Sequence, residues 1–495
     1  MARARPRHLR FLGTFAFPDE RTIVGELSVN NAKTLLELHS AEETELPNGS
    51  ASLKGIAYSG EYLTLIDCNA GESAHLTVPG KPVQYSLNVF PHYVAIGQDH
   101  LNPGERSISR IEFSTTDLPA LFYDFDVCGL VLDAKPLIDV VLEGRRKLRP
   151  VEAGDNPLVA YFSGRDCIAD VVTVMGRVSA HHRPRFTTGG PRGVRIQNRI
   201  AVAIEPDSPI AFDEAMEKVN SLATFLSVAA GRSQGISRLQ FLTRDNLLGT
   251  QQRFVIHPSF PWKVKGFDKR YKPNPGEVPL DPIRRPEEFK TVLTNWIGAH
   301  AQRRIARHRY LDSLRKTNHY GPDRLIAAAN MFDHLPKDAA PSEVELSQDL
   351  AEVRDHCLER LRALPESLNR NSAMSSLSQL GRNSLPRKIA HRADIVESKL
   401  SEAFPDLPFV ANLAVRCRNI FVHGRAGKLK LQTIEPFVPF LTDTLEFIFA
   451  ASDLIDCGWD AQRWLTSHIG NGHSFSRLRW DYTAQLTVLK QAVEQ

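Results

Sequence analysis

The sequence lacks the cysteine spacing and the charge excess that mark several classes of protein. Its six cysteines are scattered and none forms a Cys-x-x-Cys pair, which argues against structural zinc and against a disulfide scaffold. The net charge is only +4 over 495 residues. Any contact with nucleic acid must therefore come from a local basic patch, because the chain is not strongly basic as a whole.

Long apolar runs are also missing, and none reaches the length of a membrane span. The first ten residues are basic and lack the apolar segment of a secretory signal peptide, so we expect a cytoplasmic protein with no membrane partner. The sequence has no P-loop, no Gly-x-Ser-x-Gly elbow and no His-Glu-x-x-His motif. We predict no cofactor and no metal site.

What is present is the composition of an ordinary globular protein, 42% hydrophobic and 24% charged, at a length typical of two or three domains. Up to residue 204, short apolar runs alternate with Gly, Pro, Asn and Asp. This pattern predicts an antiparallel sandwich or a barrel-like sheet. Residues 213–230 then carry an apolar stripe at helical spacing.

A proline-rich segment at residues 260–286 marks the predicted domain boundary. The predicted fold class is α+β and multidomain, with a β-rich domain at 1–270, a linker at 271–286 and an all-α helical bundle at 287–495. Within the bundle the apolar spacing predicts helices at 324–335, 343–364, 386–400, 409–422 and 432–457. The Ser/Asn-rich residues 372–384 are interpreted as a loop or a frayed helix.

The most informative motif is Arg418-Asn419-Ile420-Phe421-Val422-His423, which precedes Gly424. Histidine exchanges a proton near pH 7, and arginine holds phosphate with a planar fork of donors. RNA strand cleavage needs such a pair, because the 2′-OH must lose a proton while the phosphate gains charge. Pro408 before the motif and Gly424 after it predict a helix that ends at the motif.

On that helix Asn419 and His423 are four residues apart and share a face. Arg418 and His423 are five apart, which is roughly 140° around the axis. One helix therefore does not close a pocket around both side chains, whereas two copies facing each other across a two-fold axis would. Chance spacing and complementation of the helix dipole by Arg418 are the alternative interpretations of the motif.

An Arg-Asn-x-x-x-His motif at a helix end, followed by a small residue and a long amphipathic helix, resembles the HEPN superfamily. The order of the helices and the Leu454–Gly458 ending resemble its ApeA-like branch, which is associated with bacterial anti-phage abortive infection. Diffuse similarities to the β-rich ApeA N-terminal domain lie at 54–57, 62–68, 111–118 and 223–232. In one departure, the chain has Met331-Phe332-Asp333 where the family often carries a Glu.

The resemblance implies a metal-independent endoribonuclease that acts as a homodimer or higher homo-oligomer on RNA. His423 would be the general base or acid, Arg418 would stabilise the phosphorane-like transition state, and Asn419 would orient His423 or the phosphate. The products would be a 2′,3′-cyclic phosphate and a 5′-OH. A phage-derived trigger is expected as a further partner, and the N-terminal domain as its sensor.

Other basic residues are candidates for RNA contact. Arg425, Lys428 and Lys430 follow the motif directly and would widen a phosphate-binding surface. The densest basic cluster, residues 303–310, is interpreted as a solvated helix face in preference to an RNA-tracking stripe. Two alternatives to an enzyme stay open: a non-catalytic HEPN dimerisation or RNA-binding module, and a ligand-binding β domain that carries the principal activity.

Overall fold

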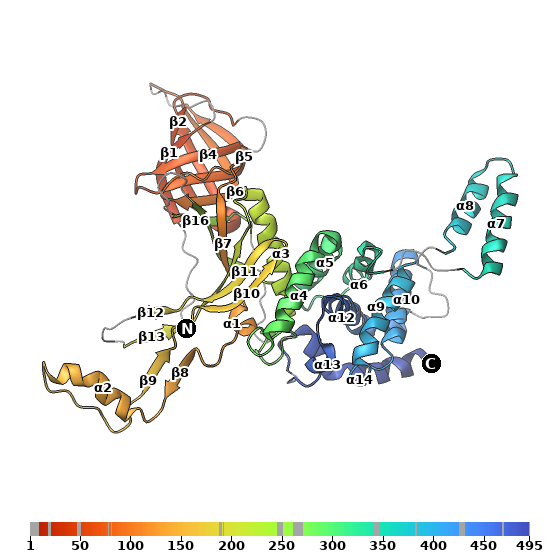
Figure 1. Cartoon of the computed structure of the whole chain (residues 1–495). Coiled ribbons are helices and arrows are strands. Elements are labelled where there is room, and N and C mark those ends of the chain that lie inside the picture. Colours follow the sequence, from red (N-terminus) through yellow and green to blue (C-terminus); the bar gives the residue numbers. More distant parts are fainter. Residues whose placement is uncertain are drawn as a thin grey trace. The chain divides into compact units, whose positions relative to one another are not determined.

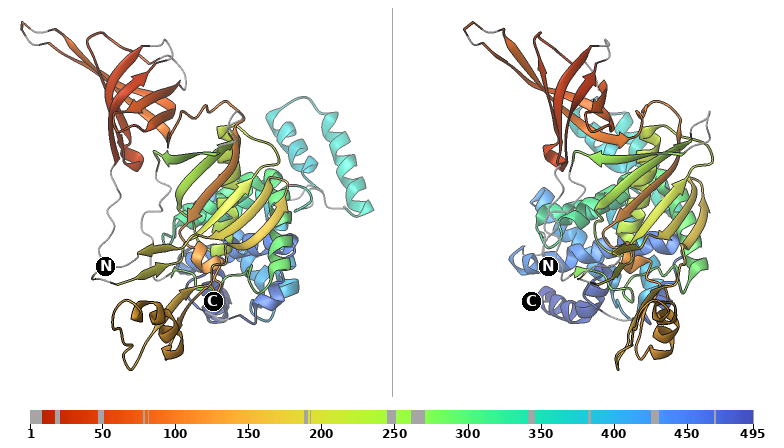
Figure 2. Two further views of the ribbon diagram at one scale, coloured as in Figure 1. Left: turned by 60° about the vertical axis from the view of Figure 1, so that its left-hand side comes forward. Right: turned by 90° about the vertical axis from the view of Figure 1, so that its left-hand side faces the viewer.

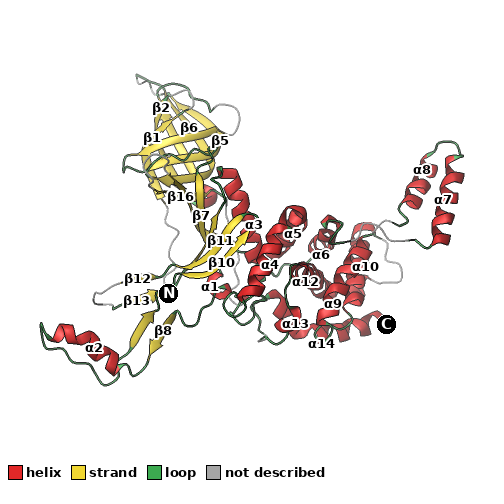
Figure 3. Cartoon of the chain, in the orientation of Figure 1, coloured by secondary structure: helices red, strands yellow, loops and turns green. Residues whose placement is uncertain are grey.

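The computed structural model describes residues 9–17, 21–46, 51–77, 79–80, 82–187, 191, 193–244, 251–260, 271–340, 346–381, 384–424, 431–467 and 470–494. The chain divides into two compact units. The first comprises Met1–Ala230, Gln234–Lys269 and Leu280–Ile297, and the second Gly231–Ser233, Arg270–Pro279 and Gly298–Gln495. Strands dominate the first unit and helices the second (Figure 3), which confirms the predicted fold class. The domain limits at 270 and 287 stay predictions.

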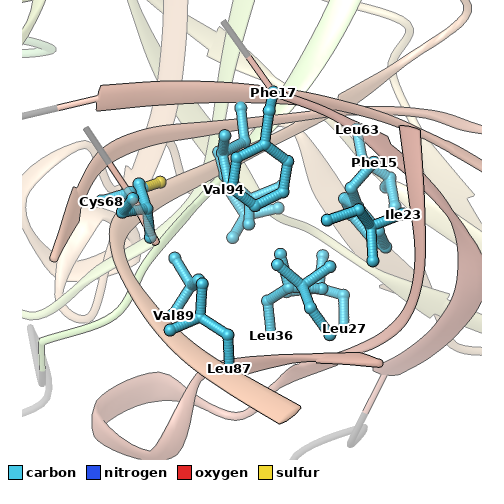
Figure 4. Close-up of a cluster of buried hydrophobic side chains, with 14 of the residues drawn as sticks. Phe15, Phe17, Ile23, Leu27, Leu36, Leu63, Cys68, Leu87, Val89 and Val94 are labelled. Atoms are coloured by element: carbon cyan, nitrogen blue, oxygen red, sulfur yellow. The ribbon is translucent and has the colours of Figure 1, made fainter. Parts of the chain in front are cut away.

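Six strands of the first unit close into an antiparallel barrel (Figure 2). Strand β1 pairs with β2 and β4, β4 pairs with β5, and β5 returns through β6 and β3 to β2. Burial alternates along β2 because successive side chains point to opposite faces of a strand. The interior is apolar and includes Phe15, Leu27, Leu36, Leu63 and Val89 (Figure 4). The strands are β1 (Leu9–Ala16), β2 (Thr22–Val29), β3 (Leu35–Ser40), β4 (Ala51–Ala57), β5 (Tyr62–Leu76) and β6 (Gln84–Gly97).

An open antiparallel sheet continues from β6 of the barrel. Its order is β16 (Gln251–Pro258), β15 (Ile236–Arg244), β7 (Ile108–Thr115), β14 (Ile200–Glu205), β11 (Gly176–His182) and β10 (Cys167–Thr173). Helix α3 (Phe212–Ala230) packs on one face, with Phe212 edge-on to Phe241 of β15 at 5.5 Å between ring centroids. The described part of this unit also contains η1 (Asn31–Lys33), α1 (Leu118–Leu121), β8 (Cys128–Val131), α2 (Lys135–Arg146), β9 (Val159–Phe162), β12 (Arg185–Thr187), β13 (Arg195–Gln197) and most of α4 (Pro286–Gly298).

The second unit is a helical bundle built around α12 (Val438–Asp456; Figure 1). Fifteen of the nineteen residues of α12 are buried, so other parts of the bundle cover the helix on nearly every side. It packs against α5, α6, α9, α10 and α14. The helices are α5 (His300–Arg315), α6 (Pro322–Asn330), η3 (Met331–His334), α7 (Gln348–Arg362), α8 (Leu368–Ser378), α9 (Leu385–Leu400), α10 (Leu407–His423), α11 (Leu431–Ile434), η4 (Glu435–Phe437), α12, α13 (Ala461–Trp464) and α14 (Ser474–Glu494).

Three expectations about the helices need correction. The continuous helix predicted at 432–457 is interrupted, because Pro436 lies in η4 and α12 begins only at Val438. The segment interpreted as a loop or frayed helix contains most of α8, which Ser367 caps by accepting a hydrogen bond from the Arg370 amide. The basic cluster at 303–310 is not a wholly solvated face, since Arg303 and Arg307 are both buried.

Candidate active site

Helix α10 carries the Arg-His motif and has the limits that its proline and glycine predict. Asp406 precedes it in the left-handed conformation (φ 55°), and Pro408 lies in its first turn, where a missing N–H removes no helical hydrogen bond. Gly424 ends it, also left-handed (φ 67°), and its N–H donates to the carbonyl of Ile420 at 2.8 Å. This is a left-handed helix end of the kind that favours glycine. His423 is therefore the last helical residue.

The apolar face of α10 is buried, and the motif lies where this face meets solvent. Val410, Leu413, Ala414 and Cys417 belong to the buried face. His423 is exposed, whereas Arg418 and Asn419 are half-buried. The helix thus fixes its position through the buried side chains and leaves the imidazole accessible to a ligand.

The Arg418 guanidinium is held by two amide oxygens. One terminal nitrogen donates to Oδ1 of Asn419 at 3.0 Å, and the other donates to Oδ1 of Asn330 at 2.9 Å. Both distances are those of good hydrogen bonds. Asn330 is the last residue of α6, so this contact joins α6 to α10. A guanidinium has five N–H donors, and two hydrogen bonds to neutral amides leave its positive charge uncompensated.

Residues Met331-Phe332-Asp333, which stand where the family often carries a Glu, place no carboxylate beside Arg418. Met331 and Phe332 are buried in the core. Asp333 is directed to Lys388 of α9, with 3.6 Å between the carboxylate and the ammonium. No carboxylate therefore forms an ion pair with Arg418 among the described residues, and the amide of Asn330 supports it instead. An arginine held by amides keeps more of its attraction for phosphate than one held by a carboxylate.

The fold of a single chain does not bring the His423 imidazole to the Arg418 guanidinium. No described residue forms a hydrogen bond with its imidazole, and Asn419 contacts Arg418 and makes no hydrogen bond to His423. The five-residue separation around α10 accounts for this. Arg425, Lys428 and Lys430 lie outside the described residues.

Two residues near the motif, Asn330 and Arg416, were not predicted from the sequence. Asn330 had no local signal, because 88 positions separate it from Arg418. Arg416 had one: it is exposed and lies seven residues before His423, two helical turns away on the same face. Arg416 therefore extends the accessible face of α10 with a second positive charge.

Buried ion pairs fix the helices behind the motif. Asp453 of α12 accepts from Arg303 at 2.7 Å and from Arg307 at 2.8 Å. Burial acts to raise the pKa of Asp453, but these two guanidinium groups hold it at about 2. Glu446, about two turns earlier on α12, accepts from Arg324 of α6 at 2.8 and 2.9 Å. Helices α5 and α6 are therefore tied to α12 by charges that must remain paired.

The first unit has a charged concavity of about 550 Å³ on its open sheet. Arg110 forms an ion pair with Glu205, and Arg183 forms one with Asp166. Burial and the neighbouring Arg183 lower the pKa of His181 in the same wall. No ion pair of the described residues involves Arg244 or Arg253. The charged residues of the lining are Arg110, Arg183, Arg244, Arg253, Glu112, Asp166, Glu205, Asp207 and His181.

No group of three or more His, Cys, Asp or Glu side chains in the described part of the chain is arranged to hold a metal ion. None of the helices described is both long and apolar enough to cross a membrane.

Comparison with known proteins gives two matches that together cover most of the chain. The family model described as ApeA N-terminal domain 1 matches residues 10–296. The model described as Apea-like HEPN matches residues 326–463, which include α10 and the Arg-His motif. Neither the curated proteins nor the solved structures contain a significant match.

Proposed function

The chain belongs to the ApeA-like HEPN family, a family of HEPN effectors in anti-phage defence, and from this premise we propose that it is a metal-independent endoribonuclease. HEPN domains typically act on RNA and often dimerise. The observation that carries the proposal is the arrangement on α10. An accessible imidazole at the helix end follows a guanidinium that two amide oxygens hold in place.

The proposed reaction uses the 2′-OH of the RNA as its nucleophile. His423 of one copy removes the 2′-OH proton, and His423 of the second copy protonates the leaving 5′-oxygen. Arg418 stabilises the negative charge that develops on the phosphorane-like transition state. The bond from phosphorus to the 5′-oxygen breaks as the bond to the 2′-oxygen forms, which leaves a 2′,3′-cyclic phosphate and a 5′-OH.

Asn419 and the basic residues complete the proposed site. The amide of Asn419 holds Arg418 at 3.0 Å, which supports an orienting role toward the phosphate through that side chain. Arg425, Lys428 and Lys430 follow His423 in sequence and would bind flanking phosphates. Because Arg418 and His423 are separated around one helix, the proposed site is composite and forms where two copies meet.

A second candidate is a non-catalytic HEPN dimerisation or RNA-binding module with a ligand-sensing β domain. Two observations favour it. Arg418 joins α10 to α6, which is a structural role in its own right. The concavity of about 550 Å³ in the first unit has the size of a small-molecule site.

The test is RNA cleavage by the purified full chain, compared with Arg418→Ala and His423→Ala in the presence and absence of EDTA. The proposal predicts that both variants melt as folded proteins and lose cleavage, that EDTA has no effect, and that the products end in a 2′,3′-cyclic phosphate. Phage protection by each variant is measured in parallel. Variants that fold and still protect would favour the second candidate.

A further inference from the structure

Helices α7 and α8 form a hairpin whose side chains are not covered by the described part of the chain. The two helices lie side by side (Figures 1 and 2), and serine side chains cap the start of both. Neither helix contains a buried residue. Ala351 and Leu358, which share one face of α7, are half-buried, in keeping with contact with α8. A two-helix hairpin of this length has too little core to be stable by itself.

A second apolar stripe on α7 is exposed to solvent. Leu350, Val353 and Cys357 follow a spacing of three and four residues, which places them on one seam. Leu350 and Val353 are 45% and 59% exposed. The exposed residues of α8, in contrast, are serine and asparagine apart from Leu368 at its first position. The apolar seam is therefore specific to α7.

The charged residues along the seam make α7 complementary to the α7 helix of a second copy that runs antiparallel to it. Asp349 lies beside the seam at the start of α7, and Arg360, three residues after Cys357, occupies the next position of the seam near the helix end. Neither side chain forms an ion pair with any described residue. In an antiparallel pair of α7 helices, Asp349 of each copy meets Arg360 of the other, while Val353 packs near Cys357. A parallel pair would place like charges opposite each other.

We propose that α7 packs antiparallel against α7 of a second copy of this chain, so that two hairpins form a four-helix bundle. The antiparallel arrangement also aligns the helix dipoles favourably. The inference rests on the proposed function in one respect, since the composite site requires two copies and the α7 seam is the surface that would hold them together.

Charge exchange across the seam provides the test. Asp349→Arg and Arg360→Asp should each weaken dimerisation of the full chain by about tenfold, because two symmetry-related pairs become repulsive. Arg362→Asp is the matched control, since Arg362 lies on the opposite side of α7 and should leave dimerisation unchanged. Sedimentation velocity measures the dimer, and thermal melting confirms that each variant is folded.

Mixing the two seam variants separates this pairing from a general effect of charge. Asp349→Arg carries arginine at both positions 349 and 360, and Arg360→Asp carries aspartate at both. The two proteins should therefore associate with each other about tenfold more tightly than either variant associates with itself. Unchanged dimerisation of both single variants, or failure of the mixture to associate, would overturn the proposal.

Cross-linking gives an independent measurement. In a background of Cys128→Ser and Cys167→Ser, which removes the two exposed thiols, a short bismaleimide should join two copies through the half-buried Cys357. Cys357→Ser should abolish the product, and its persistence would refute the seam. Monomeric seam variants that still cleave RNA would disprove the composite site and leave the α7 pairing intact. Dimers that form through α7 but never cleave RNA would disprove only the proposed function.

Discussion

The contact between Asn330 and Arg418 predicts a measurable effect of Asn330→Ala on both stability and cleavage. The substitution removes a hydrogen bond of 2.9 Å to a charged donor and leaves the other contact, to Asn419, in place. Hydrogen bonds to charged groups contribute roughly 1.5–3 kcal/mol, and the half-buried position of Arg418 reduces this to about 1 kcal/mol. For a helical unit of this size, about 1 kcal/mol lowers Tm by roughly 2–4 °C.

The free-energy cost of Asn330→Ala to cleavage should exceed its cost to folding, because a loosened Arg418 spends less time where the transition-state charge develops. A loss of about 1.4 kcal/mol in transition-state stabilisation corresponds to a tenfold lower kcat/KM. Arg418→Ala removes the charge itself and should cost about 100-fold or more, as removal of an oxyanion donor does. Asn371→Ala, at an exposed position of α8, is the control and should change neither quantity.

The assay is multiple-turnover cleavage of a labelled RNA, paired with a thermal melt of each variant. The ordering expected is wild type and Asn371→Ala highest, then Asn330→Ala, then Arg418→Ala. A variant Asn330→Ala that melts earlier but cleaves at the wild-type rate would refute the reasoning, because it would show that the contact holds two helices together without positioning a catalytic group.

Three further predictions concern other parts of the chain. Asp453→Ala removes the buried carboxylate that accepts from both Arg303 and Arg307 and should lower the free energy of unfolding by about 3–5 kcal/mol in denaturant titration; a loss below 1 kcal/mol would contradict this. The arginines hold the pKa of Asp453 at about 2, below the ~3.9 of an unfolded chain. The contribution of ionised Asp453 to the stability of the fold is therefore present above pH ~4 and should disappear as the pH falls towards 2. The measurement is Tm against pH for wild type and for Asp453→Asn. Arg244→Ser combined with Arg253→Ser should abolish phage protection and leave cleavage by the purified chain unchanged if the concavity senses a ligand, whereas full protection would rule out that role.

Local sequence rules predicted the elements that depend on neighbouring residues. Pro408 and Gly424 set the limits of α10 because proline and glycine act on the backbone where they stand. The strands of the first unit follow from short apolar runs between turn residues. Closure of the barrel through β4 and β5 could be predicted only as one of two alternatives, since it depends on pairing between distant strands.

Long-range partners explain what the sequence could not reveal. Arg303 and Arg307 look like members of a solvated basic stripe, but their partner Asp453 lies about 150 residues later. The support of Arg418 by Asn330 has the same origin, at a separation of 88 residues. The interruption before α12 differs, because Pro436 and Pro439 were visible in the sequence and outweighed an otherwise continuous apolar pattern.

The proposed mechanism requires the His423 residues of two copies to act in one active centre. Wild-type and His423→Ala chains with different tags are co-expressed in equal amounts, purified together and assayed for RNA cleavage, with each pure protein as an endpoint. If cleavage needs both imidazoles, only dimers with two wild-type chains are active, and the mixture should retain about one quarter of the wild-type rate. Pure His423→Ala should be inactive. A mixture at about one half would place an independent site in each chain, and a pure variant that cleaves at the wild-type rate would remove His423 from the mechanism.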